Sequence, residues 1–191
     1  MVNKVTTETT IGLEAHKITV EIDVINSLPA ISIVGLPDTA INEARDRVRS
    51  AIKNSEYTFP SKKVVVNLAP ADIKKVGTNF DLPIAVGILV EEEIINSDKL
   101  CNYAFLGELS LDGTIRSVNG VLPLVLGLKN FGIKNVIVPQ SNANEAALVD
   151  DINIYGANHL TDVVNHFLES PITPTKINIQ EYIKSKNKNK R

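Results

Sequence analysis

The sequence predicts an α/β (α+β) domain of about 170 residues. Strand-like segments separated by short turns dominate its first half, which is typical of antiparallel pairing. Its second half alternates helical and strand-like segments. A length of 191 residues, of which 43% are hydrophobic and 22% charged, fits one domain with a small appendage and excludes wholesale disorder.

Three short segments of the first half have the composition of strands. Residues 18–24 alternate apolar and polar side chains, which predicts a half-buried strand. Residues 30–34 follow a short turn, and we expect them to pair with residues 18–24 in antiparallel orientation. Residues 63–68 form a β-branched run, which predicts another strand.

The segment between these strands has the pattern of an amphipathic helix. Residues 40–55 place apolar side chains on one stripe at helical spacing. Asp38 or Thr39 is the expected N-cap. Glu43 and Arg47 have the i,i+4 spacing of an ion pair on the helix surface.

The rest of the chain predicts further helices and strands. Residues 82–93 are apolar nearly all round, which predicts a buried helix. Asp112-Gly113 predicts a hairpin between residues 104–111 and 114–118. The other expected elements are a helix over residues 122–131, strands over residues 135–138 and 152–155, a short helix opened by a capping box at Asn142 and Glu145, and a helix from Thr161 to about residue 168.

Charge divides the chain into two unlike parts. Residues 1–169 are predicted to form the domain, and residues 170–191 a linker or basic tail without fixed structure. The last eight residues contain five of the 20 Lys and Arg residues and no acid, which leaves 15 basic against 22 acidic residues before them. The total of −2 therefore combines an acidic body of about −7 with a basic tail.

Several kinds of site are excluded by composition. The single Cys101 cannot form an internal disulfide and is expected to be partly buried. His16, His159 and His166 are expected at the surface or at helix ends, so no metal site is predicted. No G-x-x-x-x-G-K-[ST] loop and no dinucleotide fingerprint occurs, so this chain alone is not expected to hydrolyse ATP. No apolar run approaches the length of a membrane span, and a cytoplasmic location is expected.

Seven short motifs follow one another along the chain: ITVEIDV (18–24), VGLPD (34–38), EARDRVRSAI (43–52), NLAPAD (67–72), FDLPIAVG (80–87), FLGELS (105–110) and GIKNVIVP (132–139). In this order they resemble the N-terminal domain of the competence protein ComM/YifB family, the Mg-chelatase-like AAA+ proteins. The resemblance covers roughly residues 5–169. Such domains are similar in fold to the proteolytic domain of Lon, so the resemblance implies a Lon-like mixed sheet with helices.

The resemblance also implies where a peptidase dyad would lie. A Lon-type peptidase has a Ser nucleophile in a Gly-x-Ser-x-Gly loop that opens a helix, and a Lys that assists its deprotonation. The matching loop, residues 77–81, has Asn79 at the nucleophile position, and Leu122 stands at the Lys position. Neither side chain can perform that chemistry, and the nearby hydroxyls of Thr78 and Ser117 do not occupy the required positions. The resemblance therefore implies a catalytically degenerate domain.

One row of basic residues is a candidate nucleic-acid contact. Arg45, Arg49 and Lys53 recur every fourth residue on one face of the predicted helix. Such a row is either a solvated helix face or a contact to a phosphate backbone, and the basic tail has the same two interpretations.

In the resembling family the domain precedes an ATPase motor, dependent on ATP and Mg, that forms hexameric rings and acts as a DNA branch-migration helicase in natural transformation. The resemblance therefore implies a non-catalytic domain for assembly and DNA contact. Its expected partners are the motor (in the same protein or on a separate chain), further copies of itself and DNA, with no membrane and no cofactor held by this chain. The alternatives are a regulatory protein–protein interaction module and a remnant peptidase-like domain, both without DNA binding. An isolated domain, a truncated gene and a split gene all fit the sequence.

Overall fold

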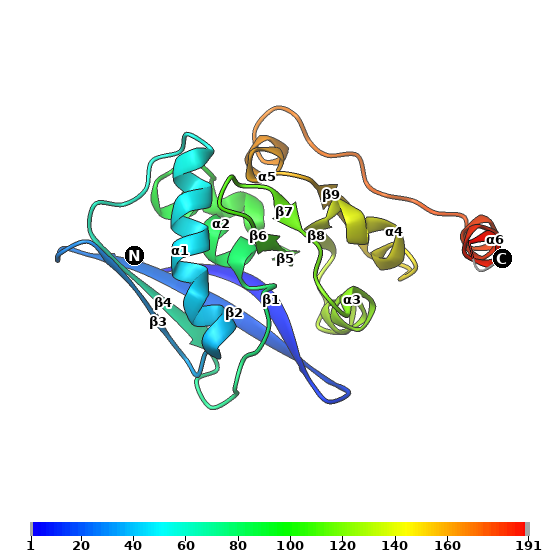
Figure 1. Ribbon diagram of the computed structural model, residues 1–191, viewed down its shortest axis with the longest axis horizontal. Helices are drawn as coiled ribbons and strands as arrows, with labels where there is room; N and C mark the ends of the chain where they lie inside the picture. The colour runs from blue at the N-terminus through cyan, green and yellow to red at the C-terminus, as the bar shows by residue number, and fades with distance from the viewer. Residues whose placement is uncertain (1, 190–191) are drawn as a thin grey trace.

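A seven-stranded mixed sheet forms the centre of the molecule, in the order β3-β4-β2-β1-β5-β8-β9 (Figure 1). The structure is a computed structural model that describes residues 2–189. β2 pairs antiparallel with β1 and β4, and the other neighbours pair in parallel. The strands are β1 (Asn3–Ile11), β2 (Glu14–Ile25), β3 (Ala30–Val34), β4 (Lys63–Ala69), β5 (Tyr103–Phe105), β8 (Asn135–Pro139) and β9 (Asn153–Ala157), with a separate hairpin of β6 (Glu108–Leu109) and β7 (Ile115–Arg116).

Helices cover both faces of this sheet. Gly87 of α2 lies against Ile22 of β2, whereas Gly127 of α3 lies against Ala15 of the same strand. Because side chains alternate between the faces of a strand, α2 and α3 lie on opposite faces, each over its own hydrophobic cluster. The helices are α1 (Thr39–Asn54), α2 (Asp81–Glu91), α3 (Val121–Asn130), α4 (Ala143–Ala146), α5 (Leu160–His166) and α6 (Ile179–Lys188), with 3₁₀ turns η1 (Ser97–Leu100) and η2 (Gln140–Asn142).

The predicted amphipathic helix is confirmed as α1. Its apolar stripe is buried against the sheet and α2, as the periodicity requires. The Asp38 side chain accepts a hydrogen bond from the Ile41 N–H at 2.8 Å and caps the helix. The expected ion pair between Glu43 and Arg47 is present, with 3.6 Å between the charged groups.

The expected antiparallel pairing of residues 30–34 with residues 18–24 is wrong. β3 pairs in parallel with β4 alone, at the edge of the sheet. The reason is that both edges of β2 are already occupied, by β1 on one side and β4 on the other. The sequence pattern also fails to predict β1, because its residues are mostly polar although Thr7, Glu8 and Thr9 are buried.

Two predicted helix caps and one hairpin are also corrected. Asn142 does not cap α4, because its side chain bonds the N–H and carbonyl of Val118 at 2.9 and 3.2 Å. His159, and not Thr161, caps α5 by accepting the Thr161 N–H on Nδ1 at 3.1 Å. The hairpin around Asp112-Gly113 is only two residues long on each side, because residues 103–105 belong to the central sheet as β5.

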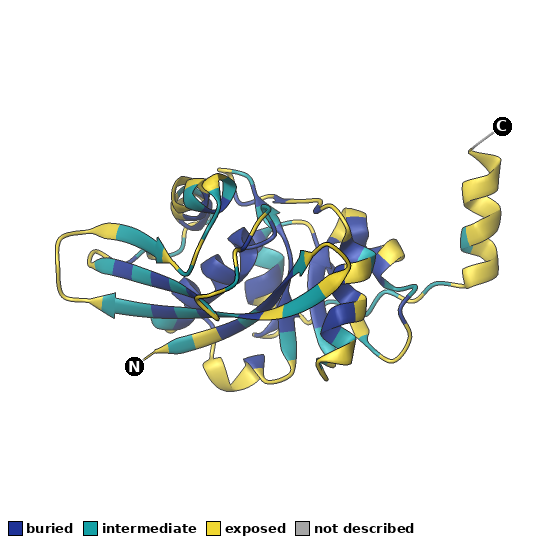
Figure 2. Cartoon of the chain, turned by 90° about the horizontal axis from the view of Figure 1, so that it is seen from below, coloured by how far each residue is buried: buried dark blue, intermediate teal, exposed yellow. Residues whose placement is uncertain are grey.

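The segment after α5 has more order than a linker or tail without fixed structure. Its first part, residues 171–175, is called the strap here. The Ile172 N–H donates to His166 Nδ1 at 2.9 Å, and the Thr175 N–H donates to the Ile154 carbonyl at 2.7 Å. The strap ends shortly before α6, which projects from the body with no buried residue (Figure 2). Within residues 2–189 no helix has the length and apolar composition to cross a membrane.

Candidate functional site

The degenerate dyad positions lie at the starts of two helices. Asn79 stands in the loop before α2, is 8% exposed, and donates from Nδ2 to the backbone carbonyl of Glu8 at 3.0 Å. Leu122 is the second residue of α3 and packs against the hydrophobic cluster around that helix. The Asn79 amide therefore connects its loop to β1 by a hydrogen bond, and Leu122 supplies an apolar packing contact. Neither position carries a nucleophile or a base.

Glu8 is a buried carboxyl group that sequence reasoning missed. It is fully buried in β1, and neither carboxylate oxygen has a hydrogen-bond partner among the described residues. Burial raises the pKa of Glu8 to about 8, because the charged form is poorly solvated there, and the nearby Leu128 backbone lowers the pKa by less than burial raises it. A Cβ on Gly127 would lie 2.1 Å from Glu8 Oε1, so the absence of a side chain in α3 provides the space for this carboxyl group.

A buried ion pair connects three of the sequence motifs. Asp81, at the start of α2, accepts hydrogen bonds from Nε and Nη2 of Arg47 at 2.7 and 3.0 Å. The Leu109 N–H donates to the same carboxylate at 3.0 Å, and Arg47 also donates to the Ala40 carbonyl at 2.8 Å. The hydrogen bond to Asp81 raises the pKa of Arg47 further above its usual value. These groups hold α1, α2 and β6 together, so the pair fixes the relative positions of these elements.

Lys75 ties two other motifs together. It is fully buried and donates from Nζ to the carbonyls of Gly35, at 2.7 Å, and Pro70. Burial lowers the pKa of Lys75, as expected for a cation without a buried carboxylate partner. The Lys75 N–H also donates to the Leu36 carbonyl at 3.0 Å. Lys75 therefore fastens the loop after β4 to the loop after β3.

The predicted basic row is exposed on the outer face of α1. Arg45, Arg49 and Lys53 are all exposed, and none of them forms an ion pair within residues 2–189. The Arg45 Nε donates to the Asn42 carbonyl at 3.0 Å, and the Arg49 guanidinium lies 5.8 Å from the centre of the Phe59 ring. A residue every fourth position rises about 6 Å per step, so the three cations span about 12 Å.

His159 and His166 form hydrogen bonds that stabilise the fold, whereas Cys101 lies at the surface. Cys101 is exposed, so the expected partial burial is wrong. His159 is a helix cap, in agreement with a helix-end position, while His166 is buried at the end of α5 and bonded through Nε2 to the Tyr103 hydroxyl at 2.9 Å. Burial lowers the pKa of His166. No cluster of three metal-ligating side chains occurs in the part of the chain that the structure describes.

Comparison with known proteins identifies the family. The sequence model for the family "Subunit ChlI of Mg-chelatase" matches residues 20–142. The chain belongs to this family. It is 44% identical over 153 residues to "Competence protein ComM" of Haemophilus influenzae, which covers 80% of this chain and 30% of that protein. It is also 43% identical over 171 residues to "Uncharacterized protein YifB" of Salmonella typhimurium, which covers 87% of this chain and 34% of that protein.

These matches confirm the resemblance to an N-terminal domain of the ComM/YifB family. The chain spans about a third of the length of these two relatives. A more distant similarity, 31% identity over 109 residues, joins it to "Lon protease 2" of Bacillus subtilis and covers 56% of this chain and 19% of that protein. Together with the mixed seven-stranded sheet and its helices, this similarity agrees with the expected Lon-like fold.

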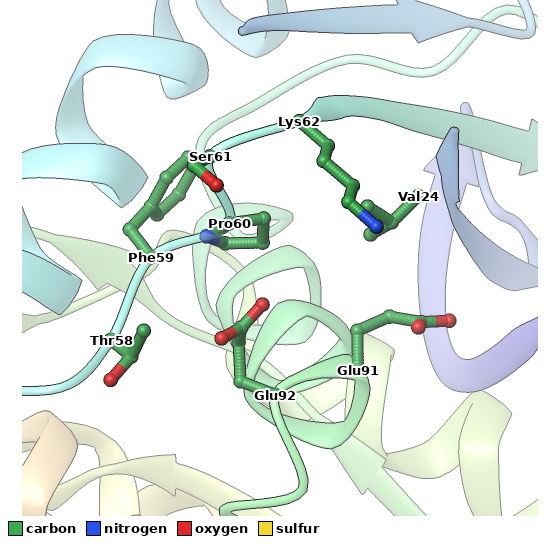
Figure 3. Close-up of a pocket in the computed structure, with 8 residues that line it drawn as sticks. All are labelled: Val24, Thr58, Phe59, Pro60, Ser61, Lys62, Glu91 and Glu92. Atoms are coloured by element: carbon green, nitrogen blue, oxygen red, sulfur yellow. The ribbon is translucent and has the colours of Figure 1, made fainter. Parts of the chain in front are cut away.

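This ChlI-family domain has a hollow of about 350 Å³ between the end of α2 and the loop before β4 (Figure 3). Glu92 rises into it toward Pro60, and Lys62 extends toward Val24. Burial and the neighbouring charge of Glu91 raise the pKa of Glu92. Neither dyad position, Asn79 or Leu122, is among the residues that line this hollow. The hollow is therefore an acidic surface feature and not a remnant of the peptidase centre.

Proposed function

We propose that this chain is the non-catalytic N-terminal domain of a ComM-like, Mg-chelatase-family AAA+ ATPase that acts as a DNA branch-migration helicase in natural transformation. In this proposal the domain contributes to assembly and contacts DNA through the outer face of α1. ATP and Mg belong to the motor, which is a further domain or a separate chain. Membership of the Mg-chelatase ChlI family supports the ATPase context, and the similarity to a competence protein supports the context of transformation.

The observation that carries the non-catalytic role is the state of the dyad positions. The Asn79 amide is bonded to the backbone of β1, and an amide cannot form the acyl intermediate of a serine-type peptidase. Leu122 has no group that could accept a proton. We therefore expect no turnover of casein or of unstructured peptides. Hydrolysis that survives purification and an inhibitor of contaminating proteases would contradict this role.

The exposed row on α1 supports the DNA contact. Three long cations that have no ion-pair partner among the described residues lie on one helix face and can each approach a phosphate along one strand. Glu43 and Asp46 lie on the same helix and weaken the local positive potential. We therefore expect weak, sequence-independent and salt-sensitive binding.

A gel-retardation experiment at low salt tests this surface. The variant R45E/R49E/K53E should lose retardation of single- and double-stranded DNA while its circular dichroism spectrum stays unchanged. The matched control K4E/K17E/K134E reverses three basic residues outside α1 and should retain retardation. Equal binding by wild type and R45E/R49E/K53E would refute the α1 contact.

A regulatory protein–protein interaction module is the second candidate function. The acidic body favours it, since about −7 charges on residues 1–183 repel a phosphate backbone. This candidate predicts no DNA retardation at any salt concentration, together with binding to a separate motor chain.

A further inference from the structure

The strap is attached to the body of the domain at few points. In Figure 1 it lies within the orange segment that leaves α5 and runs toward α6. The Ile172 N–H donates to His166 Nδ1 at 2.9 Å, and the half-buried Ile172 side chain packs against the hydrophobic cluster around α2. The Thr175 N–H donates to the Ile154 carbonyl at 2.7 Å. Within residues 2–189 the strap forms no other hydrogen bond, so each of these two contributes much of its attachment.

The hydrogen bond from Ile172 requires a neutral His166. A backbone N–H can only donate, so Nδ1 accepts and carries no proton, and the ring proton is on Nε2. Nε2 lies 2.9 Å from the Tyr103 hydroxyl and donates to it. Burial, and then the charge and hydrogen bond of Tyr155, raise the pKa of Tyr103 to about 12, so Tyr103 keeps its own proton. The imidazole and its phenol partner are therefore both uncharged while the strap is in place.

Aromatic rings surround the imidazole of His166, and no acid is bonded to it. The ring centres of Tyr155 on β9 and Tyr103 on β5 lie 4.7 and 5.6 Å from that of the imidazole. The strap, with the sequence PITPT, contributes no titratable side chain. Asp162, one turn earlier on α5, accepts backbone N–H groups at the start of the helix, and Lys99 of η1 donates to a backbone carbonyl at its end. Within residues 2–189 no carboxylate forms an ion pair with His166.

Protonation of His166 removes the acceptor of the strap. An imidazolium carries a proton on both nitrogens, so Nδ1 then directs a donor at the Ile172 N–H. The new charge also lies in a buried place without a partner, where it is costly. Burial lowers the pKa of His166, which means that the closed strap favours the neutral ring. By linkage, a proton on the ring favours the released strap, and the attachment is lost as the pH falls.

We propose that His166 is a pH-sensitive latch that holds the strap at neutral pH and releases it in acid. Release leaves the Ile154 carbonyl unpaired on the terminal strand β9. It also removes one wall of a hollow of about 450 Å³ whose lining includes Tyr103 and Tyr155. Because only residues 176–178 connect the strap to α6, the latch sets how α6 is attached to the domain. This inference goes beyond the proposed function and does not depend on the DNA contact of α1.

NMR spectroscopy of the full chain, from about pH 8 to about pH 5, tests the latch. The ring ¹⁵N shifts of His166 report its protonation, and amide exchange relative to free peptides reports the protection of Ile172 and Thr175. Loss of one hydrogen bond predicts that protection of both amides falls about tenfold, with the midpoint of the His166 titration. Thr175 is decisive because its acceptor is Ile154 and not the imidazole.

Two variants separate the latch from a general effect of pH. In H166N the amide oxygen stands near the place of Nδ1 and can accept from Ile172 without titrating, so protection should not change over this range, whatever its level. The control H16N removes a histidine on β2 and should keep the wild-type profile.

Three results would each overturn the proposal. The first is a His166 that stays neutral until circular dichroism shows unfolding of the whole chain. The second is a Thr175 amide that keeps its protection when His166 is protonated, because then only the local bond breaks. The third is an H166N profile that falls with the wild-type midpoint.

Discussion

Replacing Glu8 by Gln should remove a pH dependence of stability that the wild type shows. The carboxyl group is buried, and neither of its oxygens meets hydrogen-bond geometry with a partner within residues 2–189. Burial raises its pKa from 4.5 to about 8, against a smaller lowering of the pKa by the nearby Leu128 backbone. The folded state therefore holds a proton that the unfolded state releases between these values. Stability from Glu8 is fully present below about pH 4.5 and is lost as the pH rises through about 8.

The size of this loss follows from the pKa values. One pKa unit corresponds to about 1.4 kcal/mol, so the rise from 4.5 to about 8 gives an upper limit of about 5 kcal/mol. Water that reaches the carboxylate reduces this value, and we expect the free energy of unfolding to fall by about 2–4 kcal/mol between pH 5 and pH 9. That loss is large beside the roughly 5–15 kcal/mol stability of a typical domain.

Urea unfolding at a series of pH values measures the effect. E8Q has nearly the same shape as the protonated carboxyl group and should match wild type near pH 5, then become the more stable protein at alkaline pH. His166, whose pKa is lowered by burial, contributes stability that is lost as the pH falls. It is present in both proteins, so the difference between the two profiles isolates Glu8. Parallel profiles, with E14Q as the exposed control, would refute the reasoning.

Three further substitutions test the packing around the site. Arg47→Met leaves the buried Asp81 carboxylate without its cation and should cost about 3–5 kcal/mol in urea unfolding, whereas an effect below about 1 kcal/mol would show that the pair is dispensable. Gly127→Ala pushes a methyl group against Glu8 and should cost about 1–3 kcal/mol, and a neutral result would contradict the close approach. His166→Phe removes the acceptor for the strap and should speed limited proteolysis within residues 171–175, while an unchanged cleavage rate would show that packing alone holds the strap.

The amphipathic helix α1 and the buried helix α2 could be predicted, because the spacing of their apolar residues depends directly on which faces of each helix are buried. The pairing of neighbouring strands was harder to predict, since β3 has the same composition whether it pairs with β2 or with β4. β1 shows no alternation of apolar and polar residues, because polar side chains are buried in it. The buried Thr7 hydroxyl donates to the Phe105 carbonyl at 2.8 Å, so its hydrogen-bonding capacity is satisfied inside the sheet. The capping-box pattern at Asn142 failed because a distant loop supplied better hydrogen-bond partners.

The residues of the candidate site, too, could be predicted only in part. Asn79 and Leu122 could be placed by resemblance, because a loop that opens a helix is a local motif. Glu8 and the partner of Arg47 could not be found, since both depend on contacts between segments far apart in the chain. The local pairing of Arg47 with Glu43 is present, but the buried partner is Asp81, which lies 34 residues away.

The salt dependence of DNA binding tests the proposed function most directly. Fluorescence anisotropy of a labelled duplex measures the binding constant at several salt concentrations. Three phosphate contacts by Arg45, Arg49 and Lys53 predict a slope of about −2.7 in a plot of log K against log salt, or a loss of about 40-fold for a fourfold rise in salt. R45E/R49E/K53E should abolish binding. Absence of binding by wild type at low salt, or a slope unchanged in R45E/R49E/K53E, would contradict the DNA contact.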